Sequence, residues 1–508
     1  MPAIRSCRSA PEPMPLSGAI ERHAARIPQN PAFHLEDRVL SYGGLAVTAR
    51  TCHSAFTTLA PEGRSVIGRK TRLIALVCGN HLLFPAAFIA ATAGNNCVAL
   101  IDPHLPDAMR GRMLEKLAPD IVVTAQGDGL LASASRTGGS QRLAECATTD
   151  APPLPEGHDD DPFLIVFTSG TTADPKPIIR DRRSWRISLS AGAPFFGIDI
   201  ETHSYAPGPL AHGLALYAMT ETLLGGATFH SATHFDAVSA RETMRTATIR
   251  RLVLVPTMLR RLCEGPPVAS VEAITVAGAK LTAGDHALSR KHFPKADLRE
   301  YYGASELGFI TVTQPDAAAS STAVGHAFPG VMVSVLDEAG APVTAGETGT
   351  IFVQSPLVAT GYLGAGDGAG LKRFGALATV GDLGFLDADG TLHLLGRSGG
   401  MVLSGGNNIY PSEVEAALLG LACVRAAHVF GCDHADLGSE LVAVIEPSEA
   451  GLAAEDLQAA MAALLPRYKQ PRRIWQCQTM PVTPSGKVAA KTVRQWVAED
   501  NDALERLF

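Results

Sequence analysis

Short apolar runs that alternate with helix-like segments are the feature that most constrains the fold of this chain. Each run has the length of a single strand, and each is too continuously apolar for a strand with one face in water. Strands of this kind are typical of α/β proteins whose parallel sheets are covered by helices on both faces. The runs are LIALVC from Leu73, NNCVALI ending at Ile101, DIVVT from Asp120, FLIVFTSG from Phe163, RLVLVP from Arg251 and EAITVAG from Glu272.

The organisation changes along the chain. Residues 127–156 are rich in Gly, Ser, Ala and Pro, which predicts a surface crossing between two sub-blocks. After about Ala323 the pieces become β-rich, with Gly and Asp-Gly turns typical of hairpins. A linker is expected at 396–400, followed by a small α+β domain. A chain of 508 residues exceeds what one hydrophobic core usually supports, so several domains are expected.

Composition excludes several classes of protein. The net charge of −7 argues against a nucleic-acid binder, and 46% hydrophobic with 18% charged residues indicates a large core. Nine scattered cysteines without a C-x-x-C pair favour a reducing compartment over a disulfide framework. The N-terminus lacks the apolar region of a signal peptide, and the apolar stretch 82–94 is too short for a bilayer. We therefore expect a cytoplasmic protein without a membrane span.

The strongest local motif is FTSGTTADPKP, from Phe167 to Pro177, directly after an apolar run. Small hydroxyl residues and glycine let backbone N–H groups approach phosphate oxygens, and Lys176 adds a positive charge. The spacing of a Walker A loop is absent. Taken alone, the motif fits an ordinary polar turn as well.

Three further motifs carry polar groups suited to a nucleotide. Tyr301–Glu306 combines an aromatic ring, a hydroxyl and a carboxylate, which suits base stacking, phosphate contact and a metal. Asp382 lies between two glycines, Gly381 and Gly384, and could accept hydrogen bonds from a ribose diol. Lys487 lies on the turn PSGK near the C-terminus. Each motif alone has a plain structural explanation: a strand end, a Gly-Asp turn and a surface lysine.

In this order, the motifs resemble those of the adenylate-forming superfamily of acyl-CoA synthetases, nonribosomal-peptide adenylation domains and luciferases. Further matching segments are GETGTIFVQSPLVATGYLG, TVGDLGFLDADGTL, GRSGGMVLSGGNNIYPSEVEAAL and PVTPSGKVAAKTV. The resemblance covers nearly the whole chain. It implies an α/β N-terminal body at 1–396, built from two α/β sheets and a β-rich subdomain, and a small mobile α+β domain at 397–508.

The resemblance implies ATP-dependent activation of a carboxylic acid to an acyl-adenylate, followed by transfer to a thiol. Tyr302 would stack on adenine, Ser305 would contact the α-phosphate, and Asp382 and Arg397 would bind ribose. Mg²⁺ would be held by Glu306 and Thr171. The β- and γ-phosphates would be held by Thr168, Ser169, Gly170, Thr171, Thr172 and Lys176. The nucleotide site would also include Gly278, Ala279 and Gly303.

Lys487 would be the main catalytic residue, because it would bridge the carboxylate and the α-phosphate during adenylation. In the family the small domain then rotates about a hinge, which here falls on Gly399 in place of the usual Asp or Lys. Two further departures are Ala173 and Pro177, where glycines are usual in the phosphate loop. Ala173 is poorly suited to positive φ and Pro177 offers no N–H, which predicts slower adenylation or an altered loop.

The resemblance gives less direct information about which carboxylic acid is activated and which thiol accepts the acyl group. The acid pocket would be lined near 209–214, with His212 as a wall, and by the 276–281 segment. No Asp lies between Ser204 and Leu223, which argues against an α-amino acid and favours a fatty or aryl acid. Gly405 and Gly406 resemble the glycine pair beside the pantetheine tunnel of CoA ligases, so CoA is the expected acceptor.

Two alternatives remain open on the sequence. One is a stand-alone adenylation enzyme that loads the thiol of an acyl or peptidyl carrier protein. The other is a non-catalytic nucleotide- or acyl-binding relative, which Ala173, Pro177 and Gly399 suggest. The presence of Glu306, Asp382, Arg397 and Lys487 argues against this second alternative.

Overall fold

The computed structural model describes residues 16–66, 69–145, 150–168, 175–315, 320, 322–364, 370–397, 400, 402–404, 407–434, 438–448, 454–484 and 486–508. The chain forms two compact units. The first comprises Met1–Glu201, Leu216–Phe229 and Ala359–Leu363, and the second comprises Thr202–Ala215, His230–Val358 and Gly364–Phe508.

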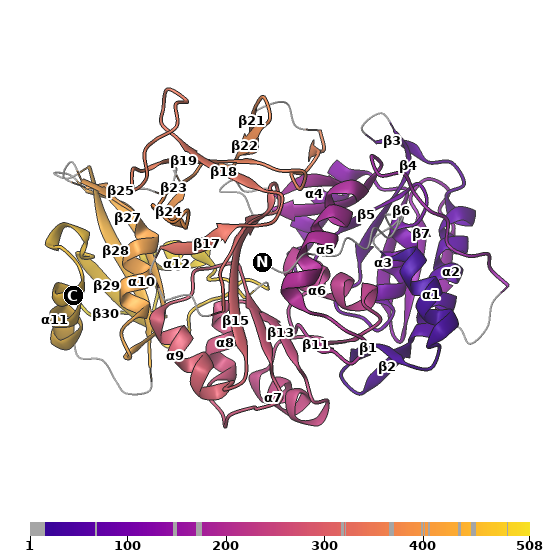
Figure 1. Ribbon diagram of the computed structural model, residues 1–508, viewed down its shortest axis with the longest axis horizontal. Coiled ribbons are helices and arrows are strands. Elements are labelled where there is room, and N and C mark those ends of the chain that lie inside the picture. The colour runs from indigo at the N-terminus through magenta and orange to yellow at the C-terminus, as the bar shows by residue number, and fades with distance from the viewer. Residues whose placement is uncertain are drawn as a thin grey trace, which may run out of the picture. The chain divides into compact units, whose positions relative to one another are not determined.

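The first unit is built on a mixed sheet with the strand order β20-β10-β9-β5-β4-β6-β7-β8, of which Figure 1 labels β4 to β7. Its central strands β4 (Arg69–Val77), β5 (Asn96–Leu100), β6 (Ile121–Gln126) and β9 (Pro162–Thr168) pair in parallel, as their apolar runs predict. β10 (Lys176–Asp181) is antiparallel to β9, and β20 (Gly361–Tyr362) is antiparallel to β10. β3 (Arg64–Val66) pairs with β4.

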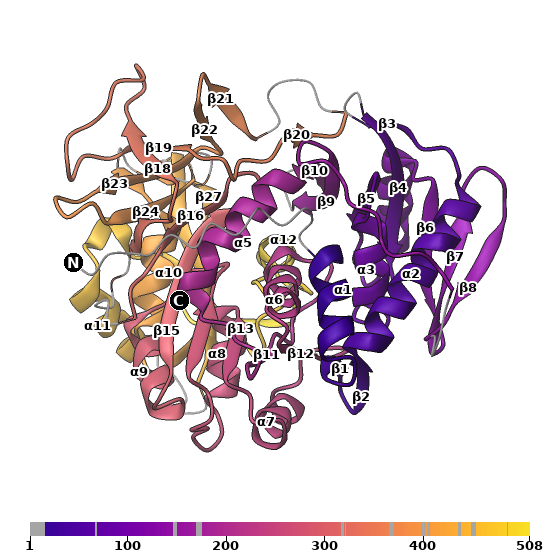
Figure 2. The ribbon, with the colours of Figure 1, turned by 45° about the vertical axis from the view of Figure 1, so that its right-hand side comes forward.

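Helices pack against this sheet, and their buried side chains contribute to the core of the unit. Figure 2 shows α2 and α3 alongside β4–β7. The helices of the unit are α1 (Ser17–Arg26), α2 (Tyr42–Leu59), α3 (Phe84–Thr92), α4 (Asp107–Leu117) and α5 (Arg182–Phe196), and β1 (Pro31–Leu35) with β2 (Arg38–Ser41) forms a hairpin. Every residue of α3 is buried, so the apolar stretch at 82–94 is a core helix. In the described part of the chain, no helix is long and apolar enough to cross a bilayer.

The expected surface crossing at 127–156 is wrong for its first half. β7 (Gly129–Ala134) and β8 (Ser140–Leu143) form antiparallel strands at the edge of the sheet, next to β6. Leu130, Ala132 and Leu143 are buried there. Buried positions alternate with half-buried ones from Leu130 to Ala134, which is the pattern of an edge strand with one buried face.

The second unit contains the β-rich part. β11 (His203–Tyr205), β13 (Arg251–Leu254), β14 (Ala273–Val276) and β15 (Asp297–Ala304) pair in parallel. The order continues through β16 (Gly308–Val312), β17 (Ala323–Ala327), β24 (Leu392–Arg397), β23 (Asp382–Leu386), β19 (Gly349–Gln354), β22 (Leu377–Thr379) and β21 (Lys372–Phe374), with β18 (Met332–Leu336) on β19. The predicted change to hairpins after Ala323 is confirmed.

Helices α7 (Ala237–Thr246), α8 (Pro256–Leu262) and α9 (Ala283–His292) follow the parallel strands of this unit. α9 begins with a capping box between Thr282 and Asp285. α6 (Gly213–Leu224) and β12 (Thr228–Ser231) lie on the chain where it passes between the two units.

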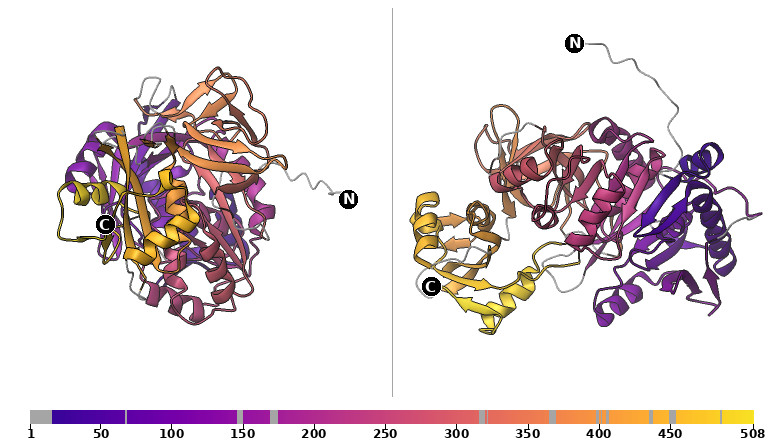
Figure 3. Two further views of the ribbon diagram at one scale, coloured as in Figure 1. Left: turned by 90° about the vertical axis from the view of Figure 1, so that its left-hand side faces the viewer. Right: turned by 90° about the horizontal axis from the view of Figure 1, so that it is seen from below.

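The C-terminal residues form the predicted α+β arrangement (Figure 3). Their sheet has the order β26-β25-β28-β29-β30, with β27 on β28. Its strands are β25 (Val402–Ser404), β26 (Asn407–Ile409), β27 (Val424–His434), β28 (Gly438–Pro447), β29 (Arg473–Cys477) and β30 (Leu504–Arg506). The helices are α10 (Pro411–Leu419), α11 (Ala454–Leu464), the short 3₁₀ helix Arg467–Lys469 and α12 (Ala490–Ala498). Val414, Val429 and Ile445 contribute to their buried core.

Candidate active site

The hydroxyl-rich motif lies at the end of a hairpin in the first unit. Thr168 is the last residue of β9 and pairs with Lys176, the first residue of β10. The strands therefore bring the two ends of the motif together. Ser169, Gly170, Thr171 and Thr172 lie outside the described residues, as does Ala173.

Pro177 lies in a strand and not in the loop where the sequence analysis placed it. It pairs with Phe167 across the hairpin, and its carbonyl accepts a hydrogen bond from the Leu363 N–H at 2.9 Å. The ring nitrogen of Pro177 therefore lies in strand β10, and the expected effect of its missing N–H on phosphate binding stays a prediction.

Tyr302 and Asp382 come together in the second unit. The Tyr302 hydroxyl donates a hydrogen bond to the Asp382 carboxylate, across 80 residues of sequence. Asp382 is buried at the start of β23 and pairs in register with Arg397 at the end of β24. The side chain of Arg397 lies outside the described part. Asp382 thus joins the Tyr302 hydroxyl to the strand position that pairs with Arg397.

Gly303 is required by the close approach of two strands. A Cβ at this position would lie 2.5 Å from the carbonyl oxygen of Gly308 on β16. A bulge between Tyr302 and Gly303 interrupts the pairing of β15 with β16. The glycine therefore fixes how β15 turns after Tyr302, because any side chain would separate the two strands.

Ser305 and Glu306 lie in the turn between β15 and β16. Glu306 is 7% exposed, so its carboxylate is largely shielded from water. A carboxylate oxygen is a ligand that Mg²⁺ prefers, and Mg²⁺ in nucleotide sites usually takes one or two carboxylates together with phosphates. Glu306 fits that requirement. Thr171, the other expected ligand, lies outside the described residues.

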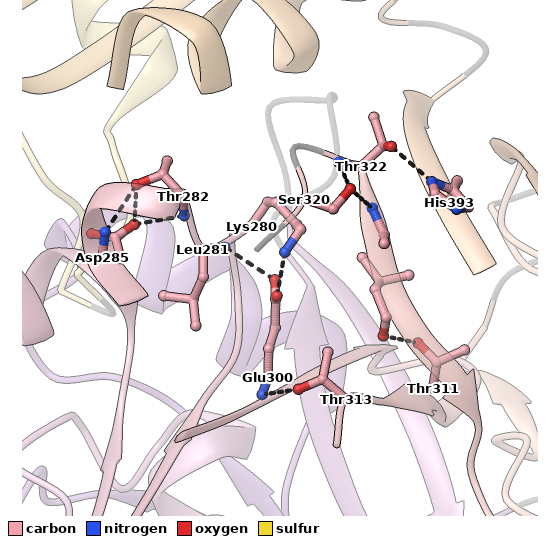
Figure 4. A network of polar contacts seen from close by, with 12 residues as sticks. Lys280, Leu281, Thr282, Asp285, Glu300, Thr311, Thr313, Ser320, Thr322 and His393 are labelled. Atoms are coloured by element: carbon pink, nitrogen blue, oxygen red, sulfur yellow. Dashed lines mark hydrogen bonds and ion pairs between the residues drawn. The ribbon is translucent and has the colours of Figure 1, made fainter. Parts of the chain in front are cut away.

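The segment that follows β14 is fixed by a buried ion pair (Figure 4). Lys280 Nζ lies 2.5 Å from Glu300 Oε2, and the Leu281 N–H donates to Glu300 Oε1 at 3.1 Å. The Glu300 N–H in turn donates to the Thr313 hydroxyl at 2.8 Å. Both oxygens of one carboxylate therefore hold the turn that contains Gly278 and Ala279.

Burial raises the pKa of Glu300, and the neighbouring Lys280 ammonium acts in the opposite direction. Sequence reasoning assigned this segment to the acid pocket but did not find the ion pair. A signal was present, because Glu300 directly precedes the Tyr301–Glu306 motif and Lys280 lies two residues after Gly278. Their pairing requires the parallel register of β14 and β15, which sequence alone does not give.

Lys487 lies against the Gly278 turn within the second unit. A Cβ on Gly278 would lie 2.9 Å from Lys487 Cε and 3.6 Å from Lys487 Nζ. Gly278 also has a φ of +95°, so both its backbone conformation and the close approach of Lys487 require a glycine at this position. The structure thus brings together the lysine of the PSGK motif and two of the residues expected near the nucleotide, Gly278 and Ala279.

His212 lies in the turn before α6, where its N–H bonds the carbonyl of Pro209 at 3.0 Å. Gly405 and Gly406, like the hinge residue Gly399, lie outside the described residues. Of the described candidates, Thr168 and Lys176 belong to the first unit and all others to the second.

The first unit thus holds the hairpin of Thr168 and Lys176, and the second unit holds a Tyr–Asp pair and a lysine, which are groups that the sequence analysis expected around a nucleotide. The AMP-binding enzyme family matches residues 20–363, and the C-terminal domain of AMP-binding enzymes matches residues 413–487. The chain belongs to the AMP-binding enzyme family.

Known proteins agree with this assignment. The chain is 32% identical to the acyl-CoA ligase YhfT of Bacillus subtilis over 432 residues, which are 84% of this chain and 88% of YhfT. It is 29% identical to the 2-succinylbenzoate–CoA ligase of Enterococcus faecalis over 346 residues, 67% and 70% of the two chains. ATP-bound MatB from Rhodopseudomonas palustris has the same fold, with a TM-score of 0.81, 21% identity and coverage of 94% and 98%.

Proposed function

We propose that this chain is an ATP-dependent acid–CoA ligase that acts on a fatty or aryl acid. The observation that carries the proposal is the contact of Lys487 with the Gly278 turn, in the unit that also holds the Tyr302–Asp382 pair. The similarity to YhfT, whose name describes an acyl-CoA ligase, supports CoA as the acceptor. The domain boundary is proposed at Arg397, with residues 397–508 carrying Lys487.

The first half-reaction joins the acid to AMP. A carboxylate oxygen of the acid attacks the α-phosphorus of ATP, and the bond to pyrophosphate breaks. Two anions approach each other in this step, so a cation placed between them lowers the barrier. Lys487 would supply that cation to the acid and the α-phosphate, and Ser305 would bind the same phosphate.

Several residues would position the nucleotide. Tyr302 would stack on adenine while its hydroxyl holds Asp382, and Asp382 with Arg397 would accept and donate hydrogen bonds at the ribose. Thr168 and Lys176, with the loop between them, would bind the β- and γ-phosphates. Glu306 would hold Mg²⁺, which neutralises phosphate charge when bound.

The second half-reaction forms the thioester. The sulfur of CoA attacks the acyl carbonyl carbon, the bond to AMP breaks, and the thiol proton is lost. Gly405 and Gly406 would border the path of the pantetheine arm, and His212 would form a wall of the acyl pocket. A carrier-protein thiol remains the alternative acceptor.

A reducing, cytoplasmic location is part of the proposal. Seven cysteines that the structure describes form no disulfide, and several are buried. Burial raises the pKa of Cys477 to about 11, so this thiol stays protonated and unreactive near neutral pH.

A panel of acids tests the function. Pyrophosphate release from ATP and Mg²⁺ is measured with octanoate, palmitate, benzoate and phenylacetate, each with and without CoA. CoA-dependent turnover with one class of acid is the expected result. Release that CoA leaves unchanged would favour a carrier-protein acceptor, and no release with any acid would count against the proposal.

Replacing Asp382 with Asn is expected to raise the KM for ATP about tenfold, because the ribose loses a charged hydrogen-bond acceptor. The effect on kcat should be smaller, since Asp382 would bind substrate and transition state similarly. Steady-state kinetics with varied ATP measure both constants. Asp389→Asn, an exposed aspartate in the β23–β24 turn, is the matched control and should leave the KM unchanged. An equal KM in Asp382→Asn and wild type would contradict the ribose assignment.

A further inference from the structure

A single hydroxyl connects the Lys487 turn to helix α8. Thr257 Oγ1 donates a hydrogen bond to the carbonyl oxygen of Gly486 at 2.6 Å, between residues 229 positions apart. Gly486 directly precedes Lys487, so this bond fixes the backbone that carries the lysine. Thr257 lies in the first turn of α8, after β13.

Glycines allow the Lys487 turn to approach its neighbours closely. A Cβ on Gly486 would lie 2.8 Å from Val255 Cγ2 and 3.2 Å from Met258 Cε. Gly486 has a φ of +78°, and Gly278 opposite Lys487 also has a positive φ. Glycines on both sides thus let the turn lie directly on Val255, Met258 and Gly278.

A second contact lies beyond the other end of α8. Arg425 NH2 is 3.5 Å from Glu264 Oε1, and Arg425 NH1 is 3.4 Å from Glu446 Oε1. The Arg425 and Glu264 side chains are 35% and 52% exposed, and ion pairs this exposed contribute little. The hydrogen bond of Thr257 is therefore the more specific of these two contacts.

We infer that Thr257 is a positioning residue that holds Lys487 in the orientation used for acyl-adenylate formation. The inference rests on the proposed role of Lys487. Thr257 does not contact the reacting atoms; it acts on the population of one orientation of the C-terminal residues. A neutral hydrogen bond suits this task under the domain rotation that the family resemblance implies, since the turn would leave again before the thiol reacts.

The two half-reactions separate this role from a merely structural one. Thr257→Val keeps the shape of the side chain and removes its hydroxyl. It is expected to slow ATP–pyrophosphate exchange with octanoate or benzoate, whichever the wild type uses, about fivefold. Thioester formation from the matching synthetic acyl-adenylate and CoA should not slow. Thr257→Ser, which keeps the hydroxyl, should restore exchange.

Thr246→Val is the matched control, because Thr246 on α7 donates its hydroxyl to the carbonyl of Glu242 at an exposed site. It should change neither half-reaction. Equal loss of both half-reactions in Thr257→Val, or no loss of either, would overturn the inference.

A measurement without turnover separates this inference from the proposed function. Spin labels on genetically encoded residues at Val238 and Leu464, both exposed, report the distance between α7 and α11 by double electron–electron resonance. With ATP and Mg²⁺ present, Thr257→Val should reduce the population at the main wild-type distance, and Thr257→Ser should not. An unchanged distribution in Thr257→Val would overturn the inference even if the protein activates no acid of the panel.

Discussion

Replacing Lys487 with Ala is expected to slow acyl-adenylate formation by about 10²- to 10³-fold, because the cation between the carboxylate and the α-phosphate is lost. The lysine stem lies on Gly278, where its Nζ can reach a nucleotide bound beside that turn. Pyrophosphate release without CoA measures this step. Thioester formation from supplied acyl-adenylate should remain largely intact, since the lysine is not needed once AMP is attached.

Lys491→Ala provides the control for charge and domain stability. Lys491 is exposed on α12, four residues after Lys487. This variant should retain both half-reactions. If Lys487→Ala loses both half-reactions equally while Lys491→Ala loses neither, Lys487 has a role other than the one assigned.

Replacing Lys280 with Met is expected to lower the free energy of unfolding by about 3 kcal/mol near pH 8, because the buried Glu300 carboxylate loses its cation. The Lys280 and Glu300 side chains are 18% and 4% exposed, so water cannot replace the lost partner at Glu300. Urea unfolding of the two proteins at several pH values measures the difference.

The loss should depend on pH. Burial raises the pKa of Glu300 in the folded protein, and removing Lys280 raises it further. A carboxyl group whose pKa is raised on folding stabilises most below its unfolded pKa, and this contribution is lost as pH rises through the folded pKa. The penalty of Lys280→Met should therefore be small near pH 4 and grow toward about pH 8.

Two variants complete this test. Lys280→Met combined with Glu300→Gln should recover much of the loss, because the amide is neutral at every pH. Lys295→Met, at an exposed position, should have no pH-dependent cost. A penalty in Lys280→Met that stays constant with pH would show that packing, and not the charge of Glu300, causes it.

The sequence was sufficient where one strong local signal specified one element. Runs such as LIALVC were predicted correctly as buried parallel strands, because six apolar residues match the length of a strand and are short for a helix. The segment 127–156 was misjudged over β7 and β8, since Gly and Ser hid a weak alternation of apolar residues.

Pairs that are distant in sequence could not be predicted. The Tyr302–Asp382 bond joins two motifs that were both recognised, but their contact depends on how β15 and β23 lie in one sheet. Thr257 gave no signal at all, since a threonine after a proline at a helix start is common. Its importance comes from the Gly486 carbonyl, which approaches only in the folded chain.

The Lys280–Glu300 pair also bears on the choice between acids with one and with two carboxylates. The turn that would border the acid carries an ammonium that is already neutralised within the protein, by a carboxylate 2.5 Å away. A second carboxylate on the substrate would have to compete with Glu300 for Lys280, and displacing Glu300 would leave a buried anion behind. If the turn borders the acid as proposed, Lys280 is therefore already engaged and does not serve as the partner of a second carboxylate.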